Sequence, residues 1–380
     1  MNILHSVAHL DEEASGPSYS VPSLAESLAK FSNNVTLVSL DRGKKIVNTP
    51  RGVNCLSFKQ ENKLKKLGIS KTMKKWFINL KENDFQIIHS HGLWMMPNIY
   101  PNEYCSKNNS IHIVAPRGTL NPEALKFSKY KKILIWNLFQ KKVLNNAKAF
   151  HATSNEEAVN IRKLGFKQPI IVSKNGVNIP EKKKKMIKNK KTLLFLSRIH
   201  PKKGVDILLD AWDCVEKKFP DWNLKIVGKG ESRYLQILKK KIQSKMINRV
   251  LLQKEVYGEN KLKAFRESDL FILPTQGENF GMVIAEAMAC ELPVITTLGA
   301  PWPDIDKKEC GWRVELNVKE LIKILNYALS CEQDKLQNMG LNCRKWMIES
   351  YNWENIALEL NNTYLNLIQN NFADNNIQLY

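Results

Sequence analysis

Two carboxylates with a fixed spacing are the residues of this 380-residue chain that point most directly to chemistry. Glu278 and Glu286 stand with seven residues between them in FILPTQGENFGMVIAEAMA, where an apolar strand runs into a Gly-bracketed loop and a helix begins near Phe280. A helix rises about 1.5 Å per residue, so Glu286 lies roughly 9 Å beyond the first turn. The pair can therefore contact hydroxyl groups on two separate parts of one ligand.

The start of the same helix predicts an anion site that needs no charged side chain. Backbone N–H groups of Asn279, Phe280 and Gly281 lie where the helix begins. The helix dipole adds partial positive charge at that end. A phosphate group is the ligand that such a site fits.

Cations gather in an earlier loop, within LLFLSRIHPKKGVDILLDAW, where a strand ends at Ser197 and a helix starts near Gly204. Arg198, Lys202 and Lys203 occupy this loop. Ligands of doubly wound sheets bind at the carboxyl ends of the strands, and guanidinium and ammonium groups there can both contact a diphosphate. We favour Arg198 and Lys203 as its ligands, and the alternative is that these are ordinary surface charges.

Two series of short β-branched runs, alternating with helical patterns, predict two doubly wound parallel sheets. The first series covers residues 35–40, 85–90, 111–115 and 148–154, and the second covers 192–197, 224–228, 249–253, 269–275 and 293–297. Between them, VSKNGVNIPEKKKKMIKNKK carries a turn signal, a proline and mutually repelling lysines, as a linker does. We therefore predict domains at 1–172 and 192–352, joined by a linker at 173–191.

The last segment, 353–380, is predicted to be a helix followed by a frayed tail. Apolar residues recur at helical spacing from Trp353 to Leu367. We expect this helix to pack back across the two domains.

Composition limits the partners without choosing one. Lys and Arg outnumber Asp and Glu by 58 to 37, a net charge of +21 that favours phosphates, nucleic acid or an anionic membrane. No window reaches the roughly 18 apolar residues of a spanning helix, and the start lacks the features of a signal peptide. The seven cysteines form no CxxC pair. These features predict a cytoplasmic protein with buried thiols.

Taken together, the two carboxylates and the SRIHPKKG loop resemble family 4 of the retaining glycosyltransferases, which have the GT-B fold. HSHGLW, APRGTL, FHATSNEE and SKNGV follow in the expected order. The pattern is most similar to bacterial O-antigen, capsule and lipopolysaccharide transferases.

The resemblance implies an α/β chain with two facing Rossmann-like domains, the first for the acceptor and the second for a nucleotide-sugar donor. Arg198 and Lys203 would hold the donor diphosphate, Glu278 the donor sugar and Glu286 the ribose. No metal or other cofactor is implied. Retention implies front-face attack, in which the acceptor hydroxyl gives its proton toward the leaving phosphate oxygen. The donor is expected to be a UDP-sugar, with GDP-mannose as the alternative.

Three residues of the first half are further candidates. His91 follows a strand in HSHGLW, and its family counterpart touches the donor sugar, through its side chain or its backbone carbonyl. Gly16 precedes Pro17, where the family commonly has a second glycine, so this loop is either a phosphate or acceptor site or a plain helix start. Arg117 in APRGTL also ends a strand and could meet the acceptor or a phosphate.

The positive charge is concentrated in two stretches of the first half. Residues 59–81 hold eight lysines and one acid, and residues 126–148 hold seven lysines and no acid. We predict that they dock on the anionic inner face of the cell membrane, where a polyprenyl-diphosphate-linked glycan would be the acceptor. A solvated lysine surface is the alternative.

Other functions that share these features remain as alternatives. They are a non-hydrolysing sugar-nucleotide epimerase, a phosphorylase and a basic nucleic-acid-binding protein. No groove-reading helix or aromatic RNA-binding sheet is predicted, so we expect no nucleic acid partner.

Overall fold

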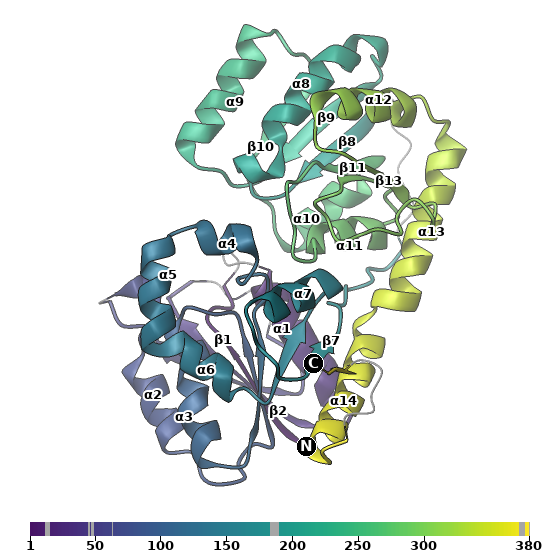
Figure 1. Cartoon of the computed structure of the whole chain (residues 1–380). Helices are drawn as coiled ribbons and strands as arrows, with labels where there is room; N and C mark the ends of the chain where they lie inside the picture. Colours follow the sequence, from purple (N-terminus) through teal and green to yellow (C-terminus); the bar gives the residue numbers. More distant parts are fainter. Residues whose placement is uncertain are drawn as a thin grey trace. The chain divides into compact units, whose positions relative to one another are not determined.

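The computed structural model describes residues 1–11, 16–44, 46, 49–62, 64–182, 190–371 and 377–379. It divides the chain into two compact units (Figure 1), Met1–Gly176 with Trp353–Tyr380, and Val177–Asn352. Residues 183–189 of the predicted linker, and 372–376 and 380 of the predicted tail, lie outside the described residues.

The first unit is built on an eight-stranded sheet of order β14-β7-β6-β5-β4-β1-β2-β3. Its strands are β1 (Asn2–Val7), β2 (Asn34–Asp41), β3 (Val53–Lys59), β4 (Ile87–His91), β5 (Ile111–Ala115), β6 (Ala149–Ala152), β7 (Ile170–Val172) and β14 (Ile377–Gln378). All neighbours are parallel except β14, which runs antiparallel to β7. Every residue of β4 is buried, as expected of a central strand in a parallel sheet.

Helices connect these strands. They are α1 (Pro17–Ala29), η1 (Lys65–Leu67), α2 (Lys71–Ile78), η2 (Met96–Asn98), α3 (Tyr100–Lys107), α4 (Pro122–Lys126), α5 (Lys129–Ile135), the π-helix η3 (Trp136–Gln140), α6 (Lys141–Asn146) and α7 (Asn155–Lys163). Helix α14 (Trp353–Ile368) joins them from the end of the chain and packs on α1. Its apolar face is buried in one core with Leu24 and Leu28, which confirms the predicted helix that crosses back to the first domain.

The second unit holds a six-stranded, wholly parallel sheet of order β10-β9-β8-β11-β12-β13. Its strands are β8 (Lys191–Leu196), β9 (Trp222–Val227), β10 (Val250–Gln253), β11 (Leu270–Leu273), β12 (Val294–Thr297) and β13 (Gly311–Val314). Its helices are η4 (Pro201–Lys203), α8 (Val205–Val215), η5 (Glu216–Lys218), α9 (Ser232–Ser244), α10 (Gly258–Arg266), α11 (Met282–Ala289), α12 (Val318–Leu329) and α13 (Gln333–Tyr351). The predicted α/β class with two doubly wound parallel sheets is thus confirmed.

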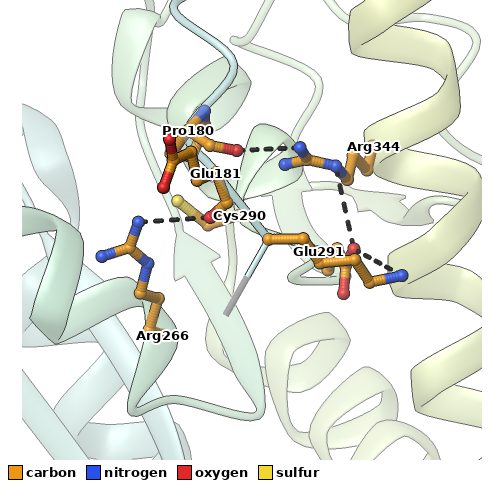
Figure 2. Close-up of a pocket in the computed structure, with 7 residues that line it drawn as sticks. Pro180, Glu181, Arg266, Cys290, Glu291 and Arg344 are labelled. Atoms are coloured by element: carbon orange, nitrogen blue, oxygen red, sulfur yellow. Dashed lines mark hydrogen bonds and ion pairs between the residues drawn. The ribbon is translucent and has the colours of Figure 1, made fainter. Parts of the chain in front are cut away.

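The segment that follows Gly176 is fastened to the second unit by backbone and arginine contacts. The Val177 N–H donates to the Tyr351 carbonyl at 2.7 Å. Figure 2 shows Arg344 and Arg266 reaching the segment from two sides. Arg344 donates to the Pro180 carbonyl at 2.8 Å and Arg266 to the Glu181 carbonyl at 3.3 Å. The cavity between them, about 20 Å³, holds about one water molecule and is too small for a substrate.

The first unit reaches past residue 172, the last residue of the predicted first domain. The Ser173 N–H donates to the Ala152 carbonyl at 3.0 Å, which ties the segment to β6. A Cβ on Gly176 would lie 2.5 Å from the Trp353 ring, so only glycine fits beside the start of α14. Residues 173–176 therefore pack with the first sheet.

Candidate active site

A close approach of two loops in the second unit depends on one glycine. Gly204 follows η4 in the left-handed region, at φ 66°. A Cβ there would lie 2.1 Å from the Pro274 carbonyl oxygen, nearer than any side chain tolerates. The loop after β8 and the loop after β11 therefore touch through their backbones.

Backbone hydrogen bonds hold the carboxylate loop in place from both sides. The Lys202 carbonyl accepts from the Gln276 N–H at 2.8 Å and from Thr275 Oγ1 at 3.2 Å. On the other side, the Glu278 N–H donates to the Gly299 carbonyl at 2.9 Å. The position of Glu278 is thus fixed by the main chain, which leaves its side chain for other contacts.

Lys203 and Glu278 form a salt bridge and hydrogen bond between Nζ and Oε1. Their side chains are 14% and 13% exposed, so the pair is largely enclosed. The two residues expected at the donor diphosphate and the donor sugar therefore lie together. In the structure each neutralises the other.

Helix α11 begins two residues later than the sequence pattern predicts, at Met282. Gly281 precedes it at φ 80°, a left-handed conformation that cannot belong to a right-handed helix. Phe280 is buried, and its carbonyl accepts from Trp302 Nε1 at 2.6 Å. The N–H groups of Asn279 and Phe280 therefore lie before the helix. The N–H groups without intrahelical partners at its start are those of the N-cap residue Gly281 and of Met282 and Val283.

Glu286 has a partner that sequence reasoning missed. Lys261 Nζ lies 2.7 Å from Oε1 and 2.6 Å from Oε2 of Glu286, and the side chains are 20% and 23% exposed. Lys261 belongs to α10, which follows β10. The available signal was its helix, because the helix after a parallel strand starts at the carboxyl edge of the sheet.

The remaining cations of the β8 loop are accessible. Arg198 is exposed and forms no hydrogen bond or salt bridge with any residue that the structure describes. The Lys202 side chain is exposed as well. Both are available to a ligand, whereas Lys203 must first exchange Glu278 for it.

In the first unit, His91 belongs to a cluster of buried histidines instead of standing alone. It is 1% exposed and ends β4. Its Nε2 lies 2.8 Å from His5 Nδ1, and its Nδ1 lies 3.0 Å from an Arg117 amino group. Strand β1 lies beside β4, which brings His5 level with His89. His89 of the same strand is buried as well.

The hydrogen bonds assign the protons of this cluster. A guanidinium can only donate, so His91 Nδ1 accepts from Arg117 and His91 Nε2–H donates to His5 Nδ1. Burial and the Arg117 charge hold the pKa of His91 well below its usual value, and they lower the pKa of His5 to about 3. Both rings are therefore neutral at physiological pH.

A second chain of bonds runs through His89. His151 Nε2 donates to the Ser173 carbonyl at 2.8 Å, so His151 Nδ1 accepts from His89 Nε2 at 3.2 Å. His89 Nδ1 then accepts from the Tyr364 hydroxyl of α14 at 2.6 Å. The cluster thus joins the first strand, the central strands and the C-terminal helix.

Ligand atoms of His5, His89 and His91 lie within 4.8 Å of one another, near enough for a metal ion to be considered. The bonding pattern opposes that role, because His91 Nε2 and His89 Nε2 carry protons and cannot coordinate. The adjacent Arg117 cation would also repel a metal. The expectation of metal independence remains a prediction.

Gly16 forms the start of α1. Its φ is −43°, and its carbonyl accepts from the Tyr19 and Ser20 N–H groups, both at 3.1 Å. This is the geometry of a helix-start turn, one of the two expectations for this residue. Residues 12–15 of the same loop lie outside the described residues.

The structure brings the candidate residues together in two groups, each within one unit. Lys203, Glu278 and the start of α11 form one, and His91 with Arg117 forms the other.

Residues 14–180 match the family model Glycosyltransferase Family 4, and residues 178–346 match the model Glycosyl transferases group 1. An uncharacterized glycosyltransferase of Haemophilus influenzae is 32% identical over 201 residues, 51% of this chain and 55% of that protein. The chain spans about half the length of the curated relatives it matches.

Solved structures share the fold across the chain. A sucrose-phosphate synthase from Thermosynechococcus elongatus has a TM-score of 0.76 at 18% identity, covering 97% of this chain and 99% of that one. Anabaena Alr3699/HepE, solved with UDP and glucose, has a TM-score of 0.72 at 16% identity, covering 96% and 99%. The chain has the GT-B fold and belongs to the glycosyltransferases, with a family 4 domain followed by a group 1 domain.

Proposed function

We propose that the protein is a retaining, metal-independent glycosyltransferase that moves a sugar from a nucleotide diphosphate donor to a lipid-linked glycan during O-antigen or capsule synthesis. The observation that carries the proposal is the pairing of Lys203 with Glu278 where two backbone-locked loops meet. Lys203 offers a cation to phosphate, and Glu278 offers a hydrogen-bond acceptor to sugar hydroxyls. The two side chains are in direct contact. Arg198 supplies a second cation on the same loop.

The proposed reaction breaks the bond between the anomeric carbon and the diphosphate oxygen. Negative charge develops on the leaving diphosphate, where Lys203, Arg198 and the first N–H groups of α11 stabilise it. The acceptor hydroxyl attacks from the face that the diphosphate leaves, and its proton passes to the leaving phosphate oxygen. Glu278 accepts hydrogen bonds from sugar hydroxyls in this scheme and forms no covalent bond.

The donor is proposed to be a UDP-sugar. Anabaena Alr3699/HepE, which shares the fold, is solved with UDP and with UDP-glucose. Glu286 would bind the ribose hydroxyls, with Lys261 holding the carboxylate. GDP-mannose is the alternative donor, since the ribose and diphosphate contacts are the same for both.

Peripheral attachment to the inner face of the cell membrane is proposed from the helices between β5 and β6. Six large apolar side chains of 127–139 are exposed, although such residues are ordinarily buried, and they are Phe127, Tyr130, Ile133, Leu134, Leu138 and Phe139. Lysines 126, 129, 131, 141 and 142 are exposed in the same run. An apolar surface with basic neighbours is the pattern of interfacial helices.

The other lysine stretch lies on the same side of the first unit. Helix α2 packs on α3, and α3 packs on α6. Figure 1 shows α2, α3, α5 and α6 together beside the first sheet. Among the described residues no helix is long and apolar enough to cross a membrane.

A panel of sugar nucleotides tests the function. Binding of the right donor should raise the melting temperature with the logarithm of its concentration, and turnover should release nucleotide diphosphate only when an acceptor is added. Consumption of the donor without acceptor, yielding an isomeric sugar nucleotide, would instead identify an epimerase. A salt-sensitive complex with RNA and no donor binding would identify a nucleic-acid-binding protein.

A further inference from the structure

Arg117 is a partly buried cation with few partners. It follows β5 and donates to Asn175 Oδ1 at 2.6 Å and to His91 Nδ1 at 3.0 Å. A guanidinium carries five N–H groups, and the enclosed Nε has no acceptor. Across the described residues, no carboxylate forms a salt bridge with it.

The carboxylate whose charge acts on Arg117 is that of Glu157, and it forms its hydrogen bonds with other groups. Glu157 is 4% exposed, and its Oε1 accepts from the Gly118 N–H at 2.6 Å. Its Oε2 accepts from Thr153 N–H and Thr153 Oγ1, both at 2.8 Å. Glu157 therefore fixes the turn after Arg117, while its charge acts on the guanidinium only from a distance.

The backbone is held in an unfavourable conformation to present this side chain. Arg117 has φ 55°, in the left-handed region that non-glycine residues seldom adopt. Such residues persist where the surroundings hold them, and they cluster at binding sites. Here the Glu157 contact to Gly118 and the Asn175 contact to the guanidinium supply that restraint.

The neighbours of Arg117 leave its positive charge unbalanced. His91 and His5 are neutral, and the bonding pattern leaves His5 Nε2–H as a second buried donor without an acceptor. Burial lowers the pKa of Arg117 to about 10, which still leaves it charged at neutral pH. A desolvated cation without a paired anion is costly, and an anionic ligand would offset that cost.

Arg162 of the same unit shows how a structural arginine differs. Its guanidinium donates to the Phe166, Gln168 and Gln378 carbonyls at 2.7 to 2.9 Å, so it ties together three stretches of chain. Arg117 touches one side-chain oxygen and one imidazole and keeps unused donors.

We infer that Arg117 binds an oxyanion of the acceptor, either a phosphate or a sugar carboxylate, at the carboxyl end of β5. The assignment to the acceptor rests on the proposed function. The anion site itself rests only on the contacts of the first unit.

The test uses protein in which the second unit's phosphate ligands are removed, Arg198→Ala with Lys203→Ala. Pyrophosphate and glucuronate, the two probes, are titrated separately by calorimetry, with glucose as the neutral control. At least one anion should bind, and Arg117→Met on this background should weaken it about 10- to 100-fold. The matched variant Arg162→Met should leave the affinity unchanged. Pyrophosphate binding alone identifies a phosphate-bearing acceptor, and glucuronate binding alone an acidic sugar.

No binding of either anion, or equal losses in Arg117→Met and Arg162→Met, would overturn the inference. A wild-type measurement covers the case in which Arg117→Met does not fold. Long-range ¹H–¹⁵N spectra of the histidine rings should show the His91 Nδ1 resonance shifting as the anion is added, because Arg117 is its donor. An unchanged resonance at saturating anion would also overturn it.

A UDP titration distinguishes failure of the Arg117 inference from failure of the proposed function. Wild-type protein and Arg117→Met should bind UDP equally, since the donor ligands belong to the other unit. Absence of UDP binding in wild type would contradict the proposed function and leave the anion result standing.

Discussion

Lys203 and Glu278 form a salt bridge with each other, although each is assigned to a different part of the donor. A bound diphosphate would compete with Glu278 for the lysine, and a bound sugar would compete with Lys203 for the carboxylate. Because both side chains are largely enclosed, neither is left charged and unpaired before the donor arrives. In the proposed function, donor binding would therefore exchange one set of paired charges for another.

Removing either partner should nearly abolish transfer without unfolding the chain. We expect Lys203→Ala and Glu278→Ala each to lower kcat/KM about 100-fold, corresponding to about 3 kcal/mol of transition-state stabilisation. Lys202→Ala is the matched control, since its exposed side chain has no role in the proposed mechanism and its carbonyl contact remains. Steady-state kinetics measure kcat/KM, and circular dichroism checks that each variant is folded. Near-wild-type turnover in either variant, or equal losses in all three, would remove the assignment.

The contact between Gly204 and Pro274 should be essential to the geometry of the donor loops. Gly204→Ala places a Cβ against the carbonyl, whereas Gly258, at φ 53°, has open space at that position. Gly204→Ala and the control Gly258→Ala should each lower the free energy of unfolding by about 1 to 2 kcal/mol, because both place alanine in a left-handed conformation. Gly204→Ala should cost about 1 to 3 kcal/mol more from overpacking and should weaken UDP binding. Denaturant unfolding and UDP titration of both variants measure this, and equal stabilities would show that the loops adjust freely.

The sheet series and the carboxylate loop could be predicted because each depends on local sequence. Strand β11 and helix α11 are predicted from an apolar run and a run with helical periodicity that lie in one segment of the sequence. Several strands lie outside the two predicted series, and one of them is β7, which has only three residues. Residues of β3 alternate in exposure at a sheet edge, β14 has two residues, and β13 begins with Gly311, which packs against the Val294 backbone. None of these has the long apolar signal of a central strand.

The cluster of buried histidines in the first unit could not be predicted, because it depends on the order of the strands in the sheet. His89 and His91 share a strand face by their spacing of two, which the sequence shows. That β1 lies beside β4 and brings in His5 is a tertiary fact. Tyr364 reaches the cluster from the other end of the chain. The sequence therefore located His91 and Arg117 at strand ends without showing that they touch.

The buried histidines should make the first unit sensitive to acid. The pKa values of His5 and His151 are lowered to about 3 and that of His112 to about 4, mainly by burial. Below about pH 6.5 the unfolded chain takes up protons on these rings, while the folded chain does not. Their contribution to stability is thus present above pH 6.5 and is lost as pH falls, by about 1.4 kcal/mol per ring and pH unit.

Hydrogen exchange measured at pH 7.5 and 5.5, corrected for intrinsic rates, tests this. Peptides from β1, β4, β5 and β6 should lose protection at pH 5.5. The second unit serves as an internal control because His200 is its one histidine. Equal losses of protection in both units would contradict the histidine account.

Metal removal should leave the reaction intact. In the proposed mechanism, Lys203, Arg198 and the N–H groups at the start of α11 stabilise the leaving diphosphate, so no divalent ion is required. We expect full turnover in excess EDTA. Strict dependence of the rate on added magnesium would show that these groups do not suffice.

The lysine-rich surface of the first unit should bind anionic membranes. Each lysine near such a surface contributes about 1 kcal/mol, so partial engagement of the two stretches gives binding that is strong at low salt and weak at high salt. Replacing Lys65, Lys66, Lys74 and Lys75 by Glu should abolish sedimentation with anionic vesicles and slow transfer to a lipid-linked acceptor. Donor binding should persist, since the residues proposed to bind the donor belong to the second unit.

A matched charge reversal separates local docking from net charge. Lys217, Lys239, Lys240 and Lys319 are exposed on the second unit, and changing them to Glu alters the net charge equally. That variant should still sediment with anionic vesicles.

Replacing Phe127 and Tyr130, which are 76% and 87% exposed, by Ser should remove the part of the binding that resists salt, because insertion of apolar side chains is not screened. Equal sedimentation with neutral and anionic vesicles, or equal losses in the two charge-reversed variants, would leave these lysines as a solvated surface.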